Sequence, residues 1–340
     1  MTWAFKHLSV ATHGWQRAQF ARAIDDRPAK GDEANTMSIA VIGSINTDLV
    51  IQVPRFAQKN ETILGKGSYQ VSQGGKGANQ AVAAAAAGLS VSMVGKIGTD
   101  AFGDGAIESL AAAGVNCDYV IRCRDHATGL ATIFLDPEGN NSITVAPGAN
   151  EDLTAIDIRA ASEIIDAARI VMLQLEIPLE AVRATVELAS KSGAVVILDP
   201  APAPDEALEF LHLVDYLTPN EVEAESLTGI SIEAEDGPQR IAAALLDMGV
   251  GNVALTMGAR GSYIANAEMS LHIEARKVSV VDTTGAGDAF SGYLGTALAK
   301  GLEFIEAAKI ASAAATLSVT RAGARSDQPD WDSVIGFMQS

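Results

Sequence analysis

From residue 38 onward, short runs of β-branched and other apolar residues alternate with longer segments whose apolar residues recur every three or four positions. The runs are typical of buried strands and the longer segments of helices that cover a sheet. Expected strands lie at 38–46, 91–98, 169–176, 194–202, 214–220, 278–281 and at the start of 251–261; expected helices lie at 78–88, 104–114, 178–193, 221–229, 240–249 and after residue 287. The alternation predicts an α/β fold: a Rossmann-like, mostly parallel sheet with helices on both faces.

Two stretches interrupt this rhythm. Residues 47–73 and 127–147 show no helical period, and the second reads as a hairpin around 136–142. Together they predict a small inserted β-sheet. We expect it to act as a lid over a ligand cleft, although a purely structural sheet edge would give the same pattern.

The first 36 residues lack the alternation and end in proline, glycine and charged residues, after which Met37 opens the first apolar run. We expect 1–36 to be a disordered extension, or to precede a working start at Met37; a targeting peptide is a weaker alternative. Residues 37–340 then form a single domain with the lid segments inserted.

Composition narrows the class of protein. The chain has 340 residues and a formal charge of −18, so nucleic acid is not expected as its main partner. No apolar run is long enough for a membrane span. There are two cysteines, Cys117 and Cys123, which are too few for a disulfide framework and whose spacing fits no zinc pattern. These features predict a cytoplasmic protein without a membrane or nucleic-acid partner.

The stretch "DTTGAGDAF", 282–290, carries the sharpest chemistry. It places the amides of Gly285, Ala286 and Gly287 at an expected helix N-terminus, where the helix dipole favours a phosphoryl group. Asp288 follows in the first turn, where it could accept a proton from an attacking hydroxyl. A favourable acid in a first helical turn is the simpler explanation. A dinucleotide fingerprint would need glycine at 290, where the chain has Phe290, so a nicotinamide oxidoreductase is not expected.

Other polar residues follow expected strands. "SQGGKGANQA" offers Gly75, Lys76, Gly77 and Asn79, but glycine at 77 replaces the Ser or Thr of a Walker loop. These residues suit a polyhydroxylated ligand; a glycine turn capped by Asn79 is the alternative. Asn46 and Asp48 lie two apart and project to one side of an extended chain, unless they form an Asx turn. Glu176 ends the run "MLQLE", as a ligand group or a solvated acid.

Two further stretches have equally balanced explanations. In "TPNEVEAE", Asn220 and Glu223 form either a helix-capping box or a site for ATP phosphates and water-bound Mg²⁺. The segment "TMGARG", namely Thr256, Met257, Gly258, Ala259, Arg260 and Gly261, is either a nucleotide cradle or an ordinary strand–turn.

In this order, "GSINTD", "GGKGANQAVAA", "MLQLE", "DPAPAP", "TPNEVEAE", "TMGARG", "DTTGAGDAF" and "VTRAGA" resemble the ribokinase (PfkB-type) family of sugar and nucleoside kinases, over about residues 38–335. Within that family, "SINTD", "GGKGAN" and "MLQLE" favour the ribose kinases over fructokinases and adenosine kinases. The resemblance implies transfer of the γ-phosphoryl group of ATP to the 5-hydroxyl of D-ribose, with Asp288 as base and Gly285, Ala286 and Gly287 as anion hole.

The resemblance also assigns the remaining roles. The residues that would bind the sugar are Asn46, Asp48, Gly75, Lys76, Gly77, Asn79, Glu176 and Asp288. Those that would bind ATP are Asn220, Thr256 to Gly261, Gly287 and Ser312, and Ser312 stands where relatives place a ring or amide beside adenine. Glu223 would bind Mg²⁺ through water. An activating K⁺ would meet Asp282, Thr284, Ser318, Arg321, Gly323 and either Ser326 or Asp327.

The family's lid also forms a dimer contact, so a homodimer through the lid sheet is implied. A deoxyribose or nucleoside kinase of the same family, and a sugar-binding protein without catalysis, stay open as alternatives.

Overall fold

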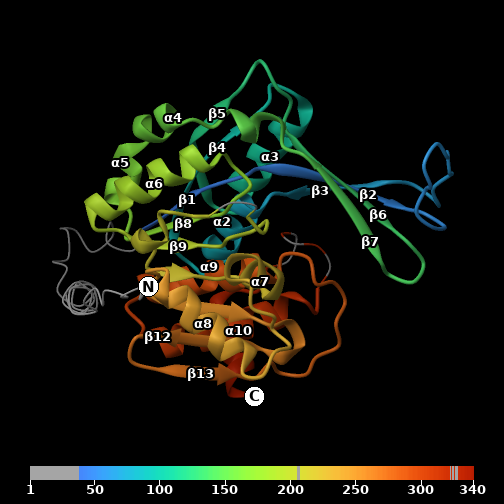
Figure 1. The fold of residues 1–340 in the computed structure, drawn as a ribbon. Coiled ribbons are helices and arrows are strands. Elements are labelled where there is room, and N and C mark those ends of the chain that lie inside the picture. The colour runs from blue at the N-terminus through green and yellow to red at the C-terminus, as the bar shows by residue number, and fades with distance from the viewer. Residues whose placement is uncertain (1–37, 205–206, 322, 324, 326–327) are drawn as a thin grey trace, which may run out of the picture.

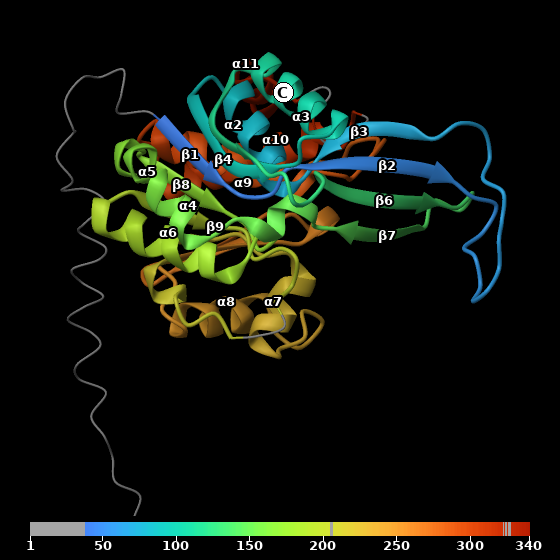
Figure 2. The same cartoon turned by 90° about the horizontal axis from the view of Figure 1, so that it is seen from above.

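The computed structural model describes residues 38–204, 207–321, 323, 325 and 328–340. The predicted extension 1–36 therefore lies outside the described residues. Figures 1 and 2 show an α/β body from which the strands labelled β2, β3, β6 and β7 project together on one side.

The strands are β1 (Ser38–Ile42), β2 (Asn46–Gln52), β3 (Gln70–Gly74), β4 (Ser90–Ile97), β5 (Val115–Arg122), β6 (Gly129–Leu135), β7 (Asn141–Ala146), β8 (Ile170–Leu173), β9 (Val195–Leu198), β10 (Tyr216–Leu217), β11 (Asn252–Thr256), β12 (Ser262–Asn266) and β13 (Ser270–Ile273). The helices are α2 (Lys76–Ala86), α3 (Ala101–Ala112), α4 (Ala155–Ala160), α5 (Ser162–Ala167), α6 (Leu179–Ser192), α7 (Glu221–Thr228), α8 (Gly237–Asp247), α9 (Ala286–Ala299), α10 (Phe304–Ser318) and α11 (Trp331–Gln339), with 3₁₀ turns η1 (Gly148–Asp152), η2 (Leu211–Leu213) and η3 (Gly258–Arg260).

Within the described residues, the main sheet has nine strands in the order β13-β12-β11-β10-β9-β8-β1-β4-β5. Pairs from β11 to β5 are parallel, whereas β12 and β13 are antiparallel to their neighbours. The chain leaves β1 toward β4 and later returns to its other side as β8. Such a reversal is a topological switch point, where ligands bind beyond the carboxyl ends of the strands.

Both faces of this sheet are covered, as the alternation predicted. In β1, Ile39 and Val41 belong to the core on the side of α2, α9 and α10, whereas Ala40 and Ile42 belong to the core on the side of α4–α6 and α8. Because successive strand residues point to opposite faces, one five-residue strand contributes to two cores. The predicted α/β fold with helices on both faces is confirmed.

The four projecting strands form a second, small sheet in the order β3-β2-β6-β7. The predicted hairpin is present: β6 and β7 pair antiparallel from Leu130 opposite Ala146 to Leu135 opposite Asn141. Asp136 closes the turn, with Oδ1 accepting from the Asn140 amide at 2.8 Å. The strands lie within or next to the predicted segments 47–73 and 127–147.

One predicted strand is absent and others are shorter than predicted: β8, β9 and β10 end at Leu173, Leu198 and Leu217, before the predicted ends at 176, 202 and 220. The strand 38–46 ends at Ile42, since Asn46 already pairs with Gly74 and Gly129 in the small sheet. Residues 278–281 form no strand: Val280 and Val281 are 61% and 63% exposed. The β-branched run misled because the segment leaves edge strand β13 and leads to α9, where no neighbouring strand can pair with it. Along the described residues, no helix is long and apolar enough to cross a bilayer.

Candidate active site

Helix α9 begins at the predicted place and positions Asp288. Gly285 precedes it with φ 77°, a left-handed conformation that glycine adopts at little cost. The amides of Ala286 and Gly287 open the helix, and Asp288 lies in the first turn with 5% of its surface exposed. Asp288 therefore lies nearly buried at the N-terminus of α9, where the Ala286 amide donates to the Thr283 carbonyl at 3.3 Å.

Helix α2 approaches the β1–β2 turn so closely that glycine is required. A Cβ on Gly75, whose φ is 89°, would stand 2.6 Å from the Asn46 nitrogen, and one on Gly77 would stand 2.7 Å from the Gly43 carbonyl carbon. A Cβ on Gly74 would overlap the Asp48 carboxylate. The glycines of "GGKG" therefore bring the start of α2 against Asn46 and Asp48.

Amide side chains hold the Asp288 carboxylate from both sides. Asn79 Nδ2 donates to Oδ2 at 2.9 Å, and Gln80 Nε2 donates to Oδ1 at 3.2 Å. The same Gln80 nitrogen reaches Asp199 Oδ2 at 2.8 Å, and Gln174 Nε2 donates to Gln80 Oε1 at 2.6 Å. This chain of bonds fixes the amide orientation of Gln80, so that its NH₂ group faces the two acids.

The other predicted sugar-binding residues surround this group. Glu176 Oε2 accepts from Ser44 Oγ at 2.5 Å and from the Lys76 amide at 3.1 Å. Asn46 is 3% exposed, and its Oδ1 accepts from Asn150 Nδ2 at 2.7 Å. Asn150 Oδ1 in turn accepts from the Ile45 amide at 2.9 Å. The 3₁₀ turn η1 thus holds the β1–β2 turn in place.

Burial raises the pKa of the acids. For Asp288 and Asp199 burial is the main cause, partly offset by the charge of Lys76. Burial also raises the pKa of Asp48 to about 6, against the lowering effect of Arg325. Burial would lower the pKa of Lys76, but Asp288 and the neighbouring carboxylates raise it. A cluster of perturbed groups at strand ends marks a candidate site.

Arg325 enters the same cluster and was missed by sequence reasoning. Its Nε donates to Asn79 Oδ1 at 2.7 Å, and Nη2 donates to the Gly74 carbonyl. Among the described residues, its buried Nη1 has no hydrogen-bond partner. Because Asn79 Oδ1 is taken by Arg325, Asn79 Nδ2 is left to face Asp288.

The predicted nucleotide side is assembled on neighbouring strands. Asn220 and Glu223 form the capping box of α7: Glu223 N donates to Asn220 Oδ1 at 3.0 Å, and Asn220 N donates to Glu223 Oε2 at 2.8 Å. Asn220 also bridges to Thr256, which opens the segment to Gly261. Burial raises the pKa of Glu223, and the charge of Asp288 adds to this. The Ser312 hydroxyl lies 3.0 Å from that of Ser262.

Part of the predicted cation set also comes together. Asp282 Oδ1 accepts from the Thr284 amide at 2.9 Å and Oδ2 from the Gly323 amide at 3.0 Å. Ser318 lies five residues before Gly323, and its carbonyl accepts from the Arg321 amide at 3.1 Å. Ser326 and Asp327 lie outside the described residues.

Sequence reasoning missed Gln80, Gln174, Asp199, Asn150 and Arg325. Gln80 lies in the stretch "SQGGKGANQA" and Gln174 in "MLQLE", both of which were singled out. Each is an amide side chain among apolar residues of a helix or a strand end, and this could have marked them as candidates. Asn150 gave no signal, since the residues of the β1–β2 turn that it holds, Asn46 and Ile45, are 104 and 105 positions away.

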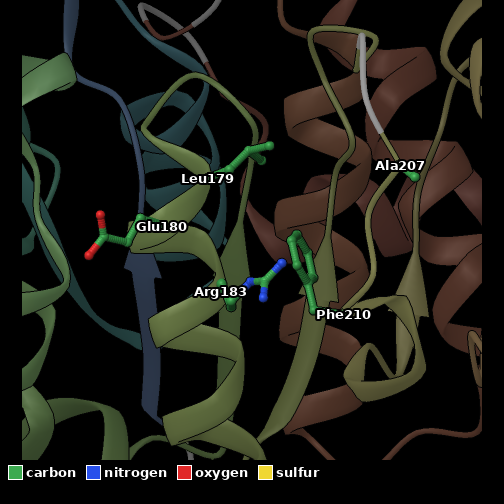
Figure 3. A pocket seen from close by; sticks show the side chains of 5 residues that line it. All are labelled: Leu179, Glu180, Arg183, Ala207 and Phe210. Atoms are coloured by element: carbon green, nitrogen blue, oxygen red, sulfur yellow. The ribbon is translucent and has the colours of Figure 1, made fainter.

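A separate cavity of about 370 Å³ lies beside α6, lined by Leu179, Glu180, Arg183, Ala207 and Phe210. Figure 3 shows the Arg183 guanidinium turned toward Phe210 and Glu180 turned away. None of the predicted site residues lines it.

Comparison with known proteins identifies the family of this chain. The family model for the pfkB family carbohydrate kinases matches residues 36–331. Ribokinase of Haemophilus influenzae is 38% identical over 302 residues, covering 89% of this chain and 98% of the relative. Deoxyribokinase of Salmonella typhi is 38% identical over 294 residues, covering 86% and 96%.

A solved structure of Arabidopsis thaliana ribokinase complexed with ribose and ATP superposes with a TM-score of 0.84 at 34% identity, covering 89% of this chain and 99% of that one. The chain therefore belongs to the pfkB family of carbohydrate kinases, and it is a sugar kinase.

Proposed function

We propose that this enzyme transfers the γ-phosphoryl group of ATP to the 5-hydroxyl of D-ribose. The observation that carries the proposal is the buried Asp288 carboxylate, held by Asn79 and Gln80 beside the amides that open α9. The similarity to ribokinases, one of them solved with ribose and ATP, supports the choice of substrates.

In this proposal the sugar lies between the β1–β2 turn and the start of α2. Asn46, Asp48, Asn79 and Glu176 offer acceptors and donors for its hydroxyl groups, with Gly75, Lys76 and Gly77 close by. Asp288 accepts the proton of the hydroxyl as its oxygen attacks the γ-phosphorus. The amides of Gly285, Ala286 and Gly287 then stabilise charge on the transferring group at the positive end of the helix dipole.

ATP is placed along Asn220 and the segment Thr256 to Gly261, with Ser312 toward the base. An excess of acidic side chains over cations supports a role for Mg²⁺: Asp199, Glu223 and Asp288 lie near Lys76, and burial raises the pKa of each acid. Oxygen-rich, electronegative surroundings suit a hard divalent cation. Glu223 would hold its water ligands, and the ion would offset phosphate charge.

We also propose an activating K⁺ beside the anion hole. The Asp282 carboxylate accepts from the Thr284 and Gly323 amides, and the Asp282 amide donates to the Val319 carbonyl at 3.2 Å, which brings the segment that follows α10 beside it. Asp282, Thr284, Ser318, Arg321 and Gly323 would supply oxygen ligands, with Asp327 or Ser326 as the last one. The ion would steady the turn that carries Gly285.

A comparison of substrates tests this function. The rate of ADP release is measured with ribose, 2-deoxyribose, fructose and adenosine, first in the presence of K⁺ and then with a large organic cation replacing K⁺. We expect the highest kcat/KM for ribose and a clear loss without K⁺. An advantage for 2-deoxyribose would overturn ribose as substrate while leaving a sugar kinase, whereas sugar binding without ADP release would contradict catalysis itself.

The small sheet supports a homodimer as a further part of the proposal. Strand register aligns Val50, Ile133 and Ile143 in one row across β2, β6 and β7. Ile143 and Val145, two apart on the same face, are 53% and 44% exposed. A row of apolar side chains on a projecting sheet is typical of a surface covered by a partner.

Ile143→Asp should therefore shift the protein toward monomer in sedimentation velocity. Thr144→Lys, on the opposite face of β7, is the control and should leave the assembly unchanged. Wild-type protein that sediments as a monomer at all concentrations would contradict this contact.

A further inference from the structure

A group of possible metal ligands lies outside the active site, at the root of the small sheet. Cys123 and His126 belong to the loop between β5 and β6, and Asp152 ends η1. Their ligand atoms all lie within 4.8 Å of one another. The spacing of Cys117 and Cys123 fits no zinc pattern, because only Cys123 belongs to this group. Its partners, His126 and Asp152, come together with it only in the fold.

We propose that Cys123, His126 and Asp152 bind one transition-metal ion of the Zn²⁺ type. Asp152 Oδ2 is the common centre: Cys123 Sγ lies 3.0 Å from it and His126 Nδ1 lies 2.7 Å from it. Thiolate, imidazole and carboxylate are the ligand types that Zn²⁺ takes in proteins.

The geometry needs little change to admit the ion. With metal–ligand bonds of about 2.0–2.3 Å, tetrahedral ligand atoms stand roughly 3.3–3.8 Å apart. The two distances to Asp152 Oδ2, 3.0 Å from Cys123 Sγ and 2.7 Å from His126 Nδ1, are shorter, so each must lengthen by less than about 1 Å. The ligand atoms of Cys123 and His126 lie within 4.8 Å of each other and can adjust by a similar amount. His126 is exposed and can rotate, whereas Cys123 and Asp152 are partly buried. Binding would release the thiol proton of Cys123 and leave the fourth position to water.

The backbone that carries these ligands is fixed independently of any ion. The Cys123 amide donates to the Ile97 carbonyl at 2.7 Å, and Lys96 Nζ donates to the Asp152 carbonyl at 2.7 Å. The Ala149 amide donates to the Ala127 carbonyl at 2.8 Å, which joins the loop to η1. A site whose backbone is held in this way loses little entropy when the ion binds.

The ion would also be linked to the sugar side of the protein. Asp152 lies two residues from Asn150, whose amide holds Asn46 and the Ile45 nitrogen. Fixing Asp152 should steady η1 and, through Asn150, the turn that presents Asn46. This consequence rests on the proposed sugar-binding role of Asn46; the metal site itself does not.

Metal binding is tested with Zn²⁺ by calorimetry and with Co²⁺ as a spectroscopic probe. We expect one ion per wild-type chain at this site, with a near-ultraviolet thiolate-to-cobalt band. Cys123→Ser should remove the band and weaken Zn²⁺ binding at least tenfold, and His126→Asn should weaken it too. Cys117→Ser, which changes the only other cysteine, is the matched control and should behave as wild type. Equal binding by wild type and Cys123→Ser, or a cobalt complex without the thiolate band, would overturn the site.

The link to the sugar is measured separately, with Mg²⁺ in large excess so that Zn²⁺ does not compete at the nucleotide. We expect Zn²⁺ to lower the KM for ribose about fivefold in wild type at constant kcat, and to leave Cys123→Ser unaffected. Wild type whose KM does not respond would refute the link while the binding data still stand. Absence of any ribose turnover would instead be a failure of the proposed function.

Discussion

At the scale of single residues, Arg325 controls two of the residues proposed to bind the sugar. Its Nε fixes the orientation of the Asn79 amide, and its charge holds the pKa of Asp48 down at about 6 against the effect of burial. Arg325→Gln should therefore move the acid limb of kcat/KM for ribose to higher pH, since Asp48 would keep its proton longer. Rate–pH profiles check this. Arg276→Gln, which removes an exposed arginine bound to Phe337 and Met338, is the control. An unshifted acid limb would show that Arg325 does not act on Asp48.

Asp48 also gives a stability prediction with a definite sign. Its pKa is raised from an ordinary value near 4 to about 6 in the folded protein, so the native state favours the protonated form. The stability that this group contributes is complete at low pH and is lost as the pH rises through about 6. Asp48→Asn should unfold at a higher temperature than wild type at pH 7.5, and the gap should narrow as the pH falls below about 6 and close near pH 4, where Asp48 is protonated in the unfolded chain as well. Thermal melts across this range measure it; a gap that widens at low pH would contradict the buried environment of Asp48.

Residue types at strand ends could be predicted from sequence, but their partners could not. Asn46, Asp48, Glu176 and Asp288 were singled out because they follow apolar runs, and Asn79 because it stands at a helix start behind glycines. Asn150 and Asp199 became visible only in the fold, because nothing local in the chain marks a side chain whose hydrogen-bond partner is more than a hundred positions away.

At the scale of elements, the start of α9 is tested by adding one methyl group. A Cβ on Gly287 would meet no protein atom within 4 Å, so Gly287→Ala should fold normally. The methyl group would nevertheless stand at the helix opening that is proposed to receive the phosphoryl group. We expect kcat to fall at least tenfold, with ribose binding nearly unchanged.

Gly336→Ala is the matched control for this change, since Gly336 also lies in a helix with open space at its Cβ. Both variants gain helix propensity, by about 1 kcal/mol at most. If Gly287→Ala turned over like Gly336→Ala, the amides of α9 would not form the anion hole.

Elements were predictable where local and long-range preferences agree. Helix α6 runs from just after Pro178 to Gly193, as its period and end signals indicated. The run 278–281 has strand propensity, but strands exist only where a neighbour supplies hydrogen bonds, and β13 ends before it.

At the scale of the whole molecule, strand order explains why these residues meet. Strands β1 and β8 adjoin at the switch point, so the turn after β1 and Glu176 after β8 reach one edge of the sheet. Helices α2 and α9 pack against each other on one face, which brings Asn79 opposite Asp288. Residues separated by 209 positions thereby form one hydrogen bond at the centre of the site.

The most direct test of this arrangement is ATP-dependent phosphorylation of ribose by Asp288→Asn. The amide cannot accept the proton of the attacking hydroxyl, so kcat should fall by about 10²–10⁴-fold. Ribose binding should be kept and the melting temperature should not fall, since burial disfavours the Asp288 carboxylate as it does that of Asp48. Asp118→Asn, an exposed change on β5, should turn over like wild type. Turnover by Asp288→Asn close to that of the unmodified enzyme would show that Asp288 is not the base.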